Sequence, residues 1–212
     1  MGREEYKMLH SIPHKVFIFG AGGFSKEVKW LVEEIPGYDF ISFIDEDDEY
    51  DFHQLLRDNL SQHFYSVIGI GIPKIRKRVY TNFSDHDNLH WPTLIHPVVI
   101  GDFPNIKFGK GCIICAGNVF TTDIKIGDFN IFNLNSTLGH DLHTGDYCVI
   151  NPNCSTSANV TLTGENLVGV GSTILASRTL GKGAILGAGA LLTKDIPDGE
   201  VWAGVPAKIL EV

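Results

Sequence analysis

The chain has 212 residues, of which 43% are apolar and 20% are charged, and it contains 23 glycines. This length and composition exclude a disordered chain and allow one large domain or two modest ones, each with a buried core. No stretch approaches the roughly eighteen apolar residues of a membrane span, and the charged and polar N-terminus lacks the apolar segment of a signal peptide. We therefore expect a soluble, cytoplasmic protein that does not contact a membrane.

The formal net charge of −8 argues against a nucleic-acid partner, because an acidic surface repels phosphate backbones. A short basic run at residues 74–78 is interpreted as a solvated helix face. Four cysteines lie in the second half of the chain, and the only C-x-x-C pair, Cys112 and Cys115, has no second pair to complete a zinc site. We expect reduced, unreactive thiols and no bound metal.

The first half of the chain alternates strands with helices. After a tail of residues 1–13, the pattern predicts a buried strand at 16–19, a glycine turn at 20–23 and a helix at 24–34. A second strand follows at 40–44, a third at 65–70, and a helix begins near residue 73. This βαβαβ order predicts a small Rossmann-like α/β domain over residues 14–95, with a parallel sheet covered by helices.

The second half, residues 96–212, has a six-residue period instead. Counted in sixes from Phe108 to Leu192, thirteen of fifteen positions are apolar, where the average composition predicts about six. The next position is often glycine, and the fifth is usually small. The small residues at that fifth position include Cys112, Ser136, Cys148, Cys154, Ser172, Ala184 and Ala190.

A six-residue repeat suits one flat side of a triangular coil. One aliphatic side chain points into the prism, a second inward site admits only a small side chain, and glycine or asparagine permits the bend. Three such units make one turn, so fifteen units predict five stacked turns of parallel strands about 4.8 Å apart. Three of the cysteines fall at the small inward site, which indicates a packing role.

These features resemble a known family. The repeats and the closing Gly-Val-Pro-Ala-Lys segment at 204–208 are similar to the left-handed β-helix of hexapeptide-repeat acyltransferases. The motifs FGAGGF at 19–24, FIDE at 43–46 and IGIG at 68–71 narrow the resemblance to sugar O- and N-acyltransferases. That group contains sialic-acid O-acetyltransferase and enzymes that N-acetylate UDP-linked 4-amino sugars. The resemblance implies a homotrimer that uses acetyl-CoA and has its active site between neighbouring subunits.

The glycine turn at 20–23 lies between a buried strand and a helix, where backbone N–H groups and the helix dipole favour a phosphate. It is not a full G-x-G-x-x-G motif, so a nucleotide-sugar diphosphate is favoured over NAD, and a tight turn without a ligand is the alternative. Asp45 ends the second strand, where a carboxylate can accept hydrogen bonds from a ribose or a base; a solvated acidic loop is the alternative. The resemblance implies that the nucleotide sugar contacts Gly22, Gly23, Phe24, Asp45, Glu46 and Gly71.

Residues 133–143 carry the predicted chemistry. His140 occupies an outward position near a corner, and the carboxylate of Asp141 beside it can hold one ring nitrogen and raise the basicity of the other. The resemblance assigns His140 as the general base and places Asn133 in the same site. A metal site at His140 and His143 lacks a third ligand in the coil, so we expect none. Direct attack on the thioester then needs no covalent enzyme intermediate.

For acetyl-CoA, the resemblance implies contacts along later coils, around Gly169, Val170, Gly187 and Ala188, with Lys208 near the CoA phosphates. Val149 occupies a position where relatives often place a histidine near the acyl donor. Apolar outer residues such as Ile131 and Leu142 are expected to be buried by trimer formation. The predicted activity is N-acetylation of a nucleotide-linked amino sugar. O-acetylation of a sugar or sialic acid, or a non-catalytic nucleotide-sugar-binding trimeric scaffold, are the alternatives.

Overall fold

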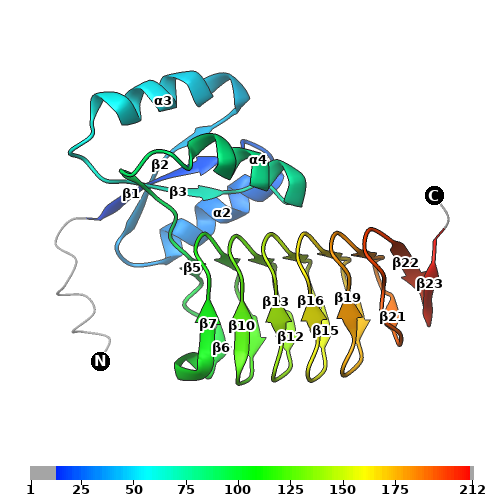
Figure 1. The fold of residues 1–212 in the computed structure, drawn as a ribbon. Helices are drawn as coiled ribbons and strands as arrows, with labels where there is room; N and C mark the ends of the chain where they lie inside the picture. Colours follow the sequence, from blue (N-terminus) through cyan, green and yellow to red (C-terminus); the bar gives the residue numbers. More distant parts are fainter. Residues whose placement is uncertain (1–12, 211–212) are drawn as a thin grey trace.

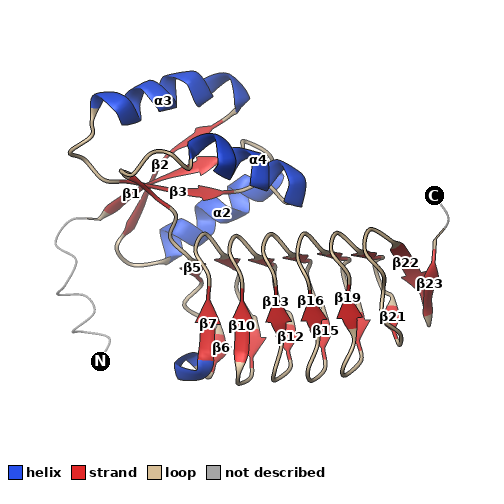
Figure 2. Ribbon diagram, viewed as in Figure 1, coloured by secondary structure: helices blue, strands red, loops and turns tan. Residues whose placement is uncertain are grey.

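The computed structural model describes residues 13–210, so the predicted tail at 1–13 lies outside it except for Pro13. An α/β domain lies against the first turns of a long β-coil (Figure 1). Colouring by secondary structure separates the two parts, because the three longer helices all belong to the α/β domain (Figure 2).

Within the described residues, the α/β domain has a four-stranded parallel sheet in the order β2-β1-β3-β4. Its strands are β1 (His14–Phe19), β2 (Tyr38–Ile44), β3 (Phe64–Ile68) and β4 (Leu89–His90). Its helices are α2 (Gly23–Glu34), η1 (Glu46–Asp48), α3 (Glu49–Asp58) and α4 (Pro73–Phe83). The predicted parallel sheet covered by helices is confirmed, whereas the sequence interpretation assigned no residues to α3, the helix between β2 and β3, or to β4.

The two faces of this sheet have different cover because strand side chains alternate. Val16 and Ile18 point to the face that carries α2 and the coil. Phe17 and Phe19 point to the opposite face, where Phe52 of α3 lies with their rings in tilted and edge-on contact. The sheet is therefore buried on both sides, as a parallel sheet requires.

The coil has three faces, which the chain visits in order. The first face contains β5 (Leu94–Ile95), β8 (Ile113–Ile114), β11 (Ile131–Phe132), β14 (Val149–Ile150), β17 (Leu167–Val168) and β20 (Ile185–Leu186), followed by β22 (Val201–Gly204) and β23 (Ala207–Ile209). The second contains β6 (Ile100–Gly101), β9 (Val119–Phe120), β12 (Thr137–Leu138), β15 (Ser155–Thr156), β18 (Thr173–Ile174) and β21 (Leu191–Leu192). The third contains β7 (Ile106–Phe108), β10 (Ile124–Ile126), β13 (His143–Thr144), β16 (Thr161–Leu162) and β19 (Thr179–Leu180).

The described chain thus makes about six turns, where the repeat count predicted five. The additional first turn escaped the count because its register is shifted. Gly101 pairs with Phe120, nineteen residues on, whereas Phe108 pairs with Ile126, eighteen residues on. The short helix η2 (Phe103–Asn105) between them holds the extra residue and interrupts the six-residue period.

The interior of the prism is as predicted. The aliphatic and aromatic positions form one continuous apolar core from Ile114 to Leu192. The fifth-position residues are buried beside it, among them Cys112, Ser136, Cys148, Cys154, Ser172, Ala184 and Ala190. Because adjacent coils stack closely, only short side chains fit at this inward corner.

The α/β domain packs on the outer side of the first face. Ile113, Ile131 and Val149 contact the apolar side of α2. At the edge between the third and first faces, Phe129 and Tyr147 adopt positive φ and stack their rings 5.4 Å apart. Bulky residues rarely take this backbone conformation, so the bend here is held by packing against the α/β domain.

Arg76 of α4 lies in this contact and corrects the interpretation of residues 74–78 as a solvated face. Its side chain is fully buried and donates a hydrogen bond to the carbonyl of Phe129. Nε and Nη1 have no hydrogen-bond partner among the described residues, and burial lowers the Arg76 pKa to about 10. Lys74, Lys77 and Arg78 are exposed as predicted.

Candidate functional site

The carboxyl ends of β1, β2 and β3 meet at one edge of the sheet, beside the glycine turn. Gly20 has φ +95°, and a Cβ there would approach Ile70 to 2.8 Å, so only glycine fits this turn. Gly22 precedes α2 as its N-cap residue, and Gly23 begins the helix. A Cβ at either would meet nothing within 4 Å, so open space lies beside the backbone at this helix start.

A cavity of about 250 Å³ opens at the same edge. Asp45 and Glu46, two of the predicted substrate residues, line it. Asp45 caps η1, since its Oδ1 accepts a hydrogen bond from the Glu46 amide at 2.9 Å and its own amide donates to Asp48. Glu46 forms a 2.7 Å ion pair with Arg78 across the cavity wall.

The remaining predicted substrate residues lie near this cavity but do not line it. Phe24 is half-buried on α2 and packs toward the coil. Gly71 lies between β3 and α4, where a Cβ would meet open space. These two positions, with Gly22 and Gly23, border the strand ends and not the cavity itself.

Sequence interpretation missed the lining residues that α3 and α4 supply. These are Glu49, Ile75, Arg78 and Val79. Glu49 was overlooked because no helix was assigned to the acidic run at 45–51, where η1 and α3 begin. The sequence did offer one indication for Arg78. It lies on the predicted helix near residue 73, which directly follows the end of a predicted strand.

The predicted catalytic pair lies at the edge between the second and third faces. Nδ1 of His140 is 2.7 Å from Oδ2 of Asp141, and both side chains are more than half exposed. Asp141 occupies the corner with φ +58°, which turns its carboxylate back toward His140. His143 follows on β13 and contacts the Asp141 carbonyl at 3.0 Å. The pair can hold an imidazole with one nitrogen free to accept a proton.

Asn133 lies at a different edge. It follows β11, at the corner between the first and second faces, and its Oδ1 accepts a hydrogen bond from the Leu134 amide. His140 lies beyond the far end of β12, so one chain does not bring these two residues together. The predicted CoA contacts at Gly169, Val170, Gly187 and Ala188 repeat the Asn133 corner in later coils.

Two further predicted contacts are placed differently. Lys208 is exposed on β23, in the hairpin that closes the coil. Val149 is 3% exposed within the apolar contact between the first face and the α/β domain, so its side chain is not available to a cofactor. The α/β domain covers this part of the first face, and the predicted cofactor contact of Val149 stays a prediction.

The structure also corrects the reasoning about Ile131 and Leu142. Ile131 is 1% exposed because α2 covers it, and Leu142 is 1% exposed because it points into the prism. Neither residue presents an apolar surface to a second chain. Trimer formation therefore needs other support.

The edge of the coil that carries His140 and the cavity lined by Asp45 and Glu46 lie on different sides of the coil. The α/β domain covers the first face, and the edge between the second and third faces is the corner opposite to it in a three-sided prism. Figure 1 shows the turns from β12 to β13 on the side of the coil away from α2, α3 and α4. Within one chain, a ligand in the cavity therefore lies apart from His140.

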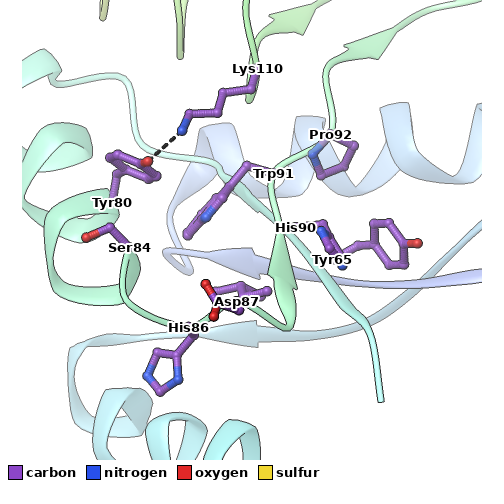
Figure 3. Close-up of a pocket in the computed structure, with 10 residues that line it drawn as sticks. Tyr65, Tyr80, Ser84, His86, Asp87, His90, Trp91, Pro92 and Lys110 are labelled. Carbon is purple, nitrogen blue, oxygen red and sulfur yellow. Dashed lines mark hydrogen bonds between the residues drawn. The ribbon is translucent and has the colours of Figure 1, made fainter. Parts of the chain in front are cut away.

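A larger cavity of about 460 Å³ lies beside the linker between the two parts (Figure 3). Several of its polar groups have partners: Lys110 donates to the Tyr80 hydroxyl at 2.6 Å, and the His90 ring bonds to His63 at 2.7 Å. Trp91 lies in its wall and stacks on Phe19. These contacts give Lys110, Tyr80, His90 and Trp91 structural partners, and the lining of this cavity contains neither His140 nor the residues at the glycine turn.

Among residues 13–210 there is no group of three or more histidine, cysteine or acidic side chains placed to hold a metal ion. No helix in that range is long and apolar enough to cross a membrane. All four cysteines are free and buried, and burial raises the pKa of Cys112 to about 11 and that of Cys148 to about 12.

The fold agrees with the comparisons to known proteins. An α/β domain followed by a three-sided parallel coil is consistent with the left-handed β-helix acyltransferases that the sequence resembles. Residues 15–83 match the PglD N-terminal domain family. The chain is similar over nearly its whole length to solved sugar N-acetyltransferases.

PerB from Caulobacter crescentus, solved with CoA and GDP-perosamine, has 27% identity and a TM-score of 0.86, covering 93% of this chain and 97% of that one. The acetyltransferase domain of PglB from Neisseria gonorrhoeae has 28% identity and a TM-score of 0.83, covering 93% and 100%. By sequence, a 2,3,4,5-tetrahydropyridine-2,6-dicarboxylate N-acetyltransferase from Staphylococcus aureus is 38% identical over 79 residues. That match covers 35% of this chain and about a third of the length of the relative.

Proposed function

We propose that this protein transfers an acetyl group from acetyl-CoA to the amino group of a nucleotide-linked amino sugar. The observation that carries the proposal is the exposed His140–Asp141 pair at a corner of the coil. PerB and the PglB domain, similar over their whole length, were solved with CoA and GDP-perosamine and with acetyl-CoA, respectively. Two further perosamine N-acetyltransferase structures carry a substituted histidine and still hold CoA and GDP-perosamine.

His140 acts as the general base in this proposal. Its Nδ1–H donates to the Asp141 carboxylate, which leaves the lone pair of Nε2 free. Nε2 takes the proton from the sugar amine as the nitrogen attacks the thioester carbon. When the carbon–sulfur bond breaks, the same proton passes to the departing CoA thiolate, so no covalent enzyme intermediate forms.

A second copy of the chain completes the site. The cavity at Asp45 and Glu46 belongs to a domain on the first face, whereas His140 lies on the opposite edge. Asn133 and the predicted CoA contacts lie apart from both, at the edge between the first and second faces. If chains associate through their second faces, the His140 edge of one meets the Asn133 edge of the next. A homotrimer, as the family resemblance implies, has this arrangement.

The outward side chains of the second face suit such an approach. In coil order they include Val119, Thr137, Ser155 and Thr173, which are short and uncharged. Short side chains allow two coils to lie close together without burying charge. The same association brings the nucleotide-sugar domain of one chain toward the catalytic edge of another.

The amino sugar is favoured over a hydroxyl acceptor because the solved perosamine enzyme is named as an N-acetyltransferase. The test is release of free thiol from acetyl-CoA with a panel of GDP-, UDP-, dTDP- and CMP-linked amino sugars and their hydroxyl analogues. We expect turnover with one amino sugar, and loss of turnover in His140→Ala with nucleotide binding retained. Turnover with hydroxyl analogues alone would assign O-acetylation, and binding without turnover would assign a scaffold.

A further inference from the structure

The cavity of about 460 Å³ beside the linker has walls from both parts of the chain (Figure 3). Its lining residues come from β3, from the end of α4, from the segment that leads through β4 into the linker, and from the coil. It shares no lining residue with the cavity at the strand ends. Its volume falls in the range of small-molecule sites, about 300–1,000 Å³.

Three aromatic side chains, those of Tyr65, Tyr80 and Trp91, form the apolar part of the wall. Trp91 is held by a stacked contact with Phe19 and an edge-on contact with Tyr80, at 5.7 and 5.6 Å between ring centroids. The Lys110 ammonium lies 4.6 Å from the centre of the Tyr80 ring. Because these contacts already fix the rings, a ligand that packs against them loses little affinity to the ordering of side chains.

The same lining carries polar groups that the protein leaves unused. Among residues 13–210, the Nε1–H of Trp91 has no acceptor, and the Asp87 carboxylate has neither a hydrogen-bond donor nor an ion-pair partner. His86 and His90 each bond to a second histidine through Nε2, at 2.7 Å, and their Nδ1 atoms have no partner in that range. Donors and acceptors therefore remain for a ligand.

The charges of the lining balance. Lys110 supplies one positive charge and Asp87 one negative charge. Burial lowers the pKa values of His86 and His90, so both imidazoles are neutral at pH 7. A phosphate or an ammonium ion gains no net attraction here, and a purely apolar ligand would leave polar groups without partners. A neutral ligand that carries several hydroxyl groups meets both conditions.

We propose that this cavity is a second binding site, for a neutral saccharide, separate from the sites for the nucleotide sugar and acetyl-CoA. A pyranose ring has a face of C–H groups and a rim of hydroxyl groups. The C–H face can stack on the aromatic wall, while rim hydroxyls accept from the Trp91 Nε1–H and donate to the Asp87 carboxylate. The lining contains neither the glycine turn nor the His140 corner, so this site binds the saccharide without reacting with it.

The indole N–H signal of Trp91 in two-dimensional ¹H–¹⁵N NMR spectra of the full-length protein tests the site. The chain has three tryptophans, and loss of one signal in Trp91→Phe identifies it. Methyl glycosides of glucose, galactose and N-acetylglucosamine are titrated to about 50 mM, above millimolar dissociation constants. We expect one of them to shift the signal, and Asp87→Ala to weaken its binding about tenfold, because a hydrogen bond to a charged group is lost. Asp85→Ala removes the neighbouring exposed acid outside the lining and should bind like the wild type.

Three results would overturn the proposal. The first is an unchanged Trp91 signal with every glycoside, including the case in which a proline-rich decapeptide, which also packs on aromatic rings, shifts it instead. The second is equal affinity for the glycoside in Asp87→Ala and the wild type. The third is loss of thiol release from acetyl-CoA in Asp87→Ala, which would assign the cavity to the acetyl-transfer reaction. We expect this variant to release thiol at the wild-type rate.

Discussion

His140 and Asp141 are adjacent in sequence, yet their side chains meet at 2.7 Å because the backbone turns sharply between them. Asp141 has φ +58°, the left-handed conformation that this corner also imposes on Asp123 and Asn159 in neighbouring coils. The bend of the prism therefore brings the two side chains together without help from a distant residue. The same bend that turns the corner in other coils here orients the imidazole of the proposed base.

Asp141→Asn should lower kcat by about 10- to 100-fold, because asparagine keeps the corner conformation but not the charge that stabilises a protonated His140. KM for both substrates should change little, and circular dichroism should match the wild type. The control is Asn159→Asp, which makes a similar exchange at the same corner one coil later. Equal kcat values for Asp141→Asn and the wild type would remove Asp141 from the proposed mechanism.

The stacking of coils should be sensitive to one methyl group at Gly145. A Cβ there would lie 2.3 Å from the Thr163 carbonyl oxygen in the next coil. Because the backbone of a stacked coil cannot move away, Gly145→Ala should lower the free energy of unfolding by about 1–3 kcal/mol. Urea denaturation followed by circular dichroism measures the change.

Gly189→Asn is the matched control for this prediction. Gly189 has φ +65° and open space around its Cβ position, and Asn153 holds the same corner two coils earlier. Asparagine tolerates this conformation, so the free energy of unfolding should stay within about 0.5 kcal/mol of the wild type. A loss at Gly189 as large as that at Gly145 would mean that coil spacing is not the cause.

Much of the fold could be predicted because each part repeats a simple period. The six-residue period from Phe108 onward reports directly which side chains point inward. The first turn of the coil was not predicted because η2 adds one residue and breaks the period. The helix α3 was not predicted because its N-terminal residues are acidic and only Phe52 and Leu56 are buried. A period cannot show an insertion or a helix that presents so little apolar surface.

The contact between His140 and Asp141 could also be predicted, since the two residues are neighbours in sequence. The relation between His140 and Asn133 could not, because seven residues span one side of the prism and place them at different corners. Nor could the burial of Val149 and Ile131, which depends on where the α/β domain docks. Local patterns identify a face of the coil, but not what covers it.

Arg76 should be a major contributor to the contact between the two parts of the chain. Arg76→Ala removes the hydrogen bond to the Phe129 carbonyl and leaves a cavity among aromatic side chains, which should cost about 3 kcal/mol of unfolding free energy. Arg76→Met fills most of the space and removes a buried charge, so its loss should be smaller. Lys74→Ala, exposed on the same helix, should change stability by less than about 0.5 kcal/mol.

Thermal unfolding measured by calorimetry and by tryptophan fluorescence distinguishes two roles for Arg76. Trp91 packs beside Phe129, so with Trp30→Phe and Trp202→Phe in the background the tryptophan fluorescence reports this contact. If Arg76 joins the two parts, Arg76→Ala should separate the fluorescence transition from the main calorimetric one. A single coincident transition at the wild-type temperature would show that the buried guanidinium contributes nothing to the contact.

The four cysteines should resist modification in the folded protein. Burial raises the pKa of Cys115 and of Cys148 to about 12, so at pH 8 neither forms the reactive thiolate. An Ellman reagent should therefore detect almost no thiol in the native protein at pH 8 and four in guanidinium chloride. Rapid reaction of any thiol in the native state would contradict their assignment to packing.

The same raised pKa values predict a loss of stability at alkaline pH. Unfolded thiols release their protons near pH 8.5, whereas the folded ones keep theirs to about pH 11 or 12, so the folded state binds more protons in between. Stability from this source is complete below about pH 8.5 and falls as the pH rises toward 12. Cys148→Ala removes one such group, so its urea midpoint should decline less steeply between pH 8 and 10.5 than that of the wild type. Parallel slopes for the two proteins would show that Cys148 titrates alike in both states.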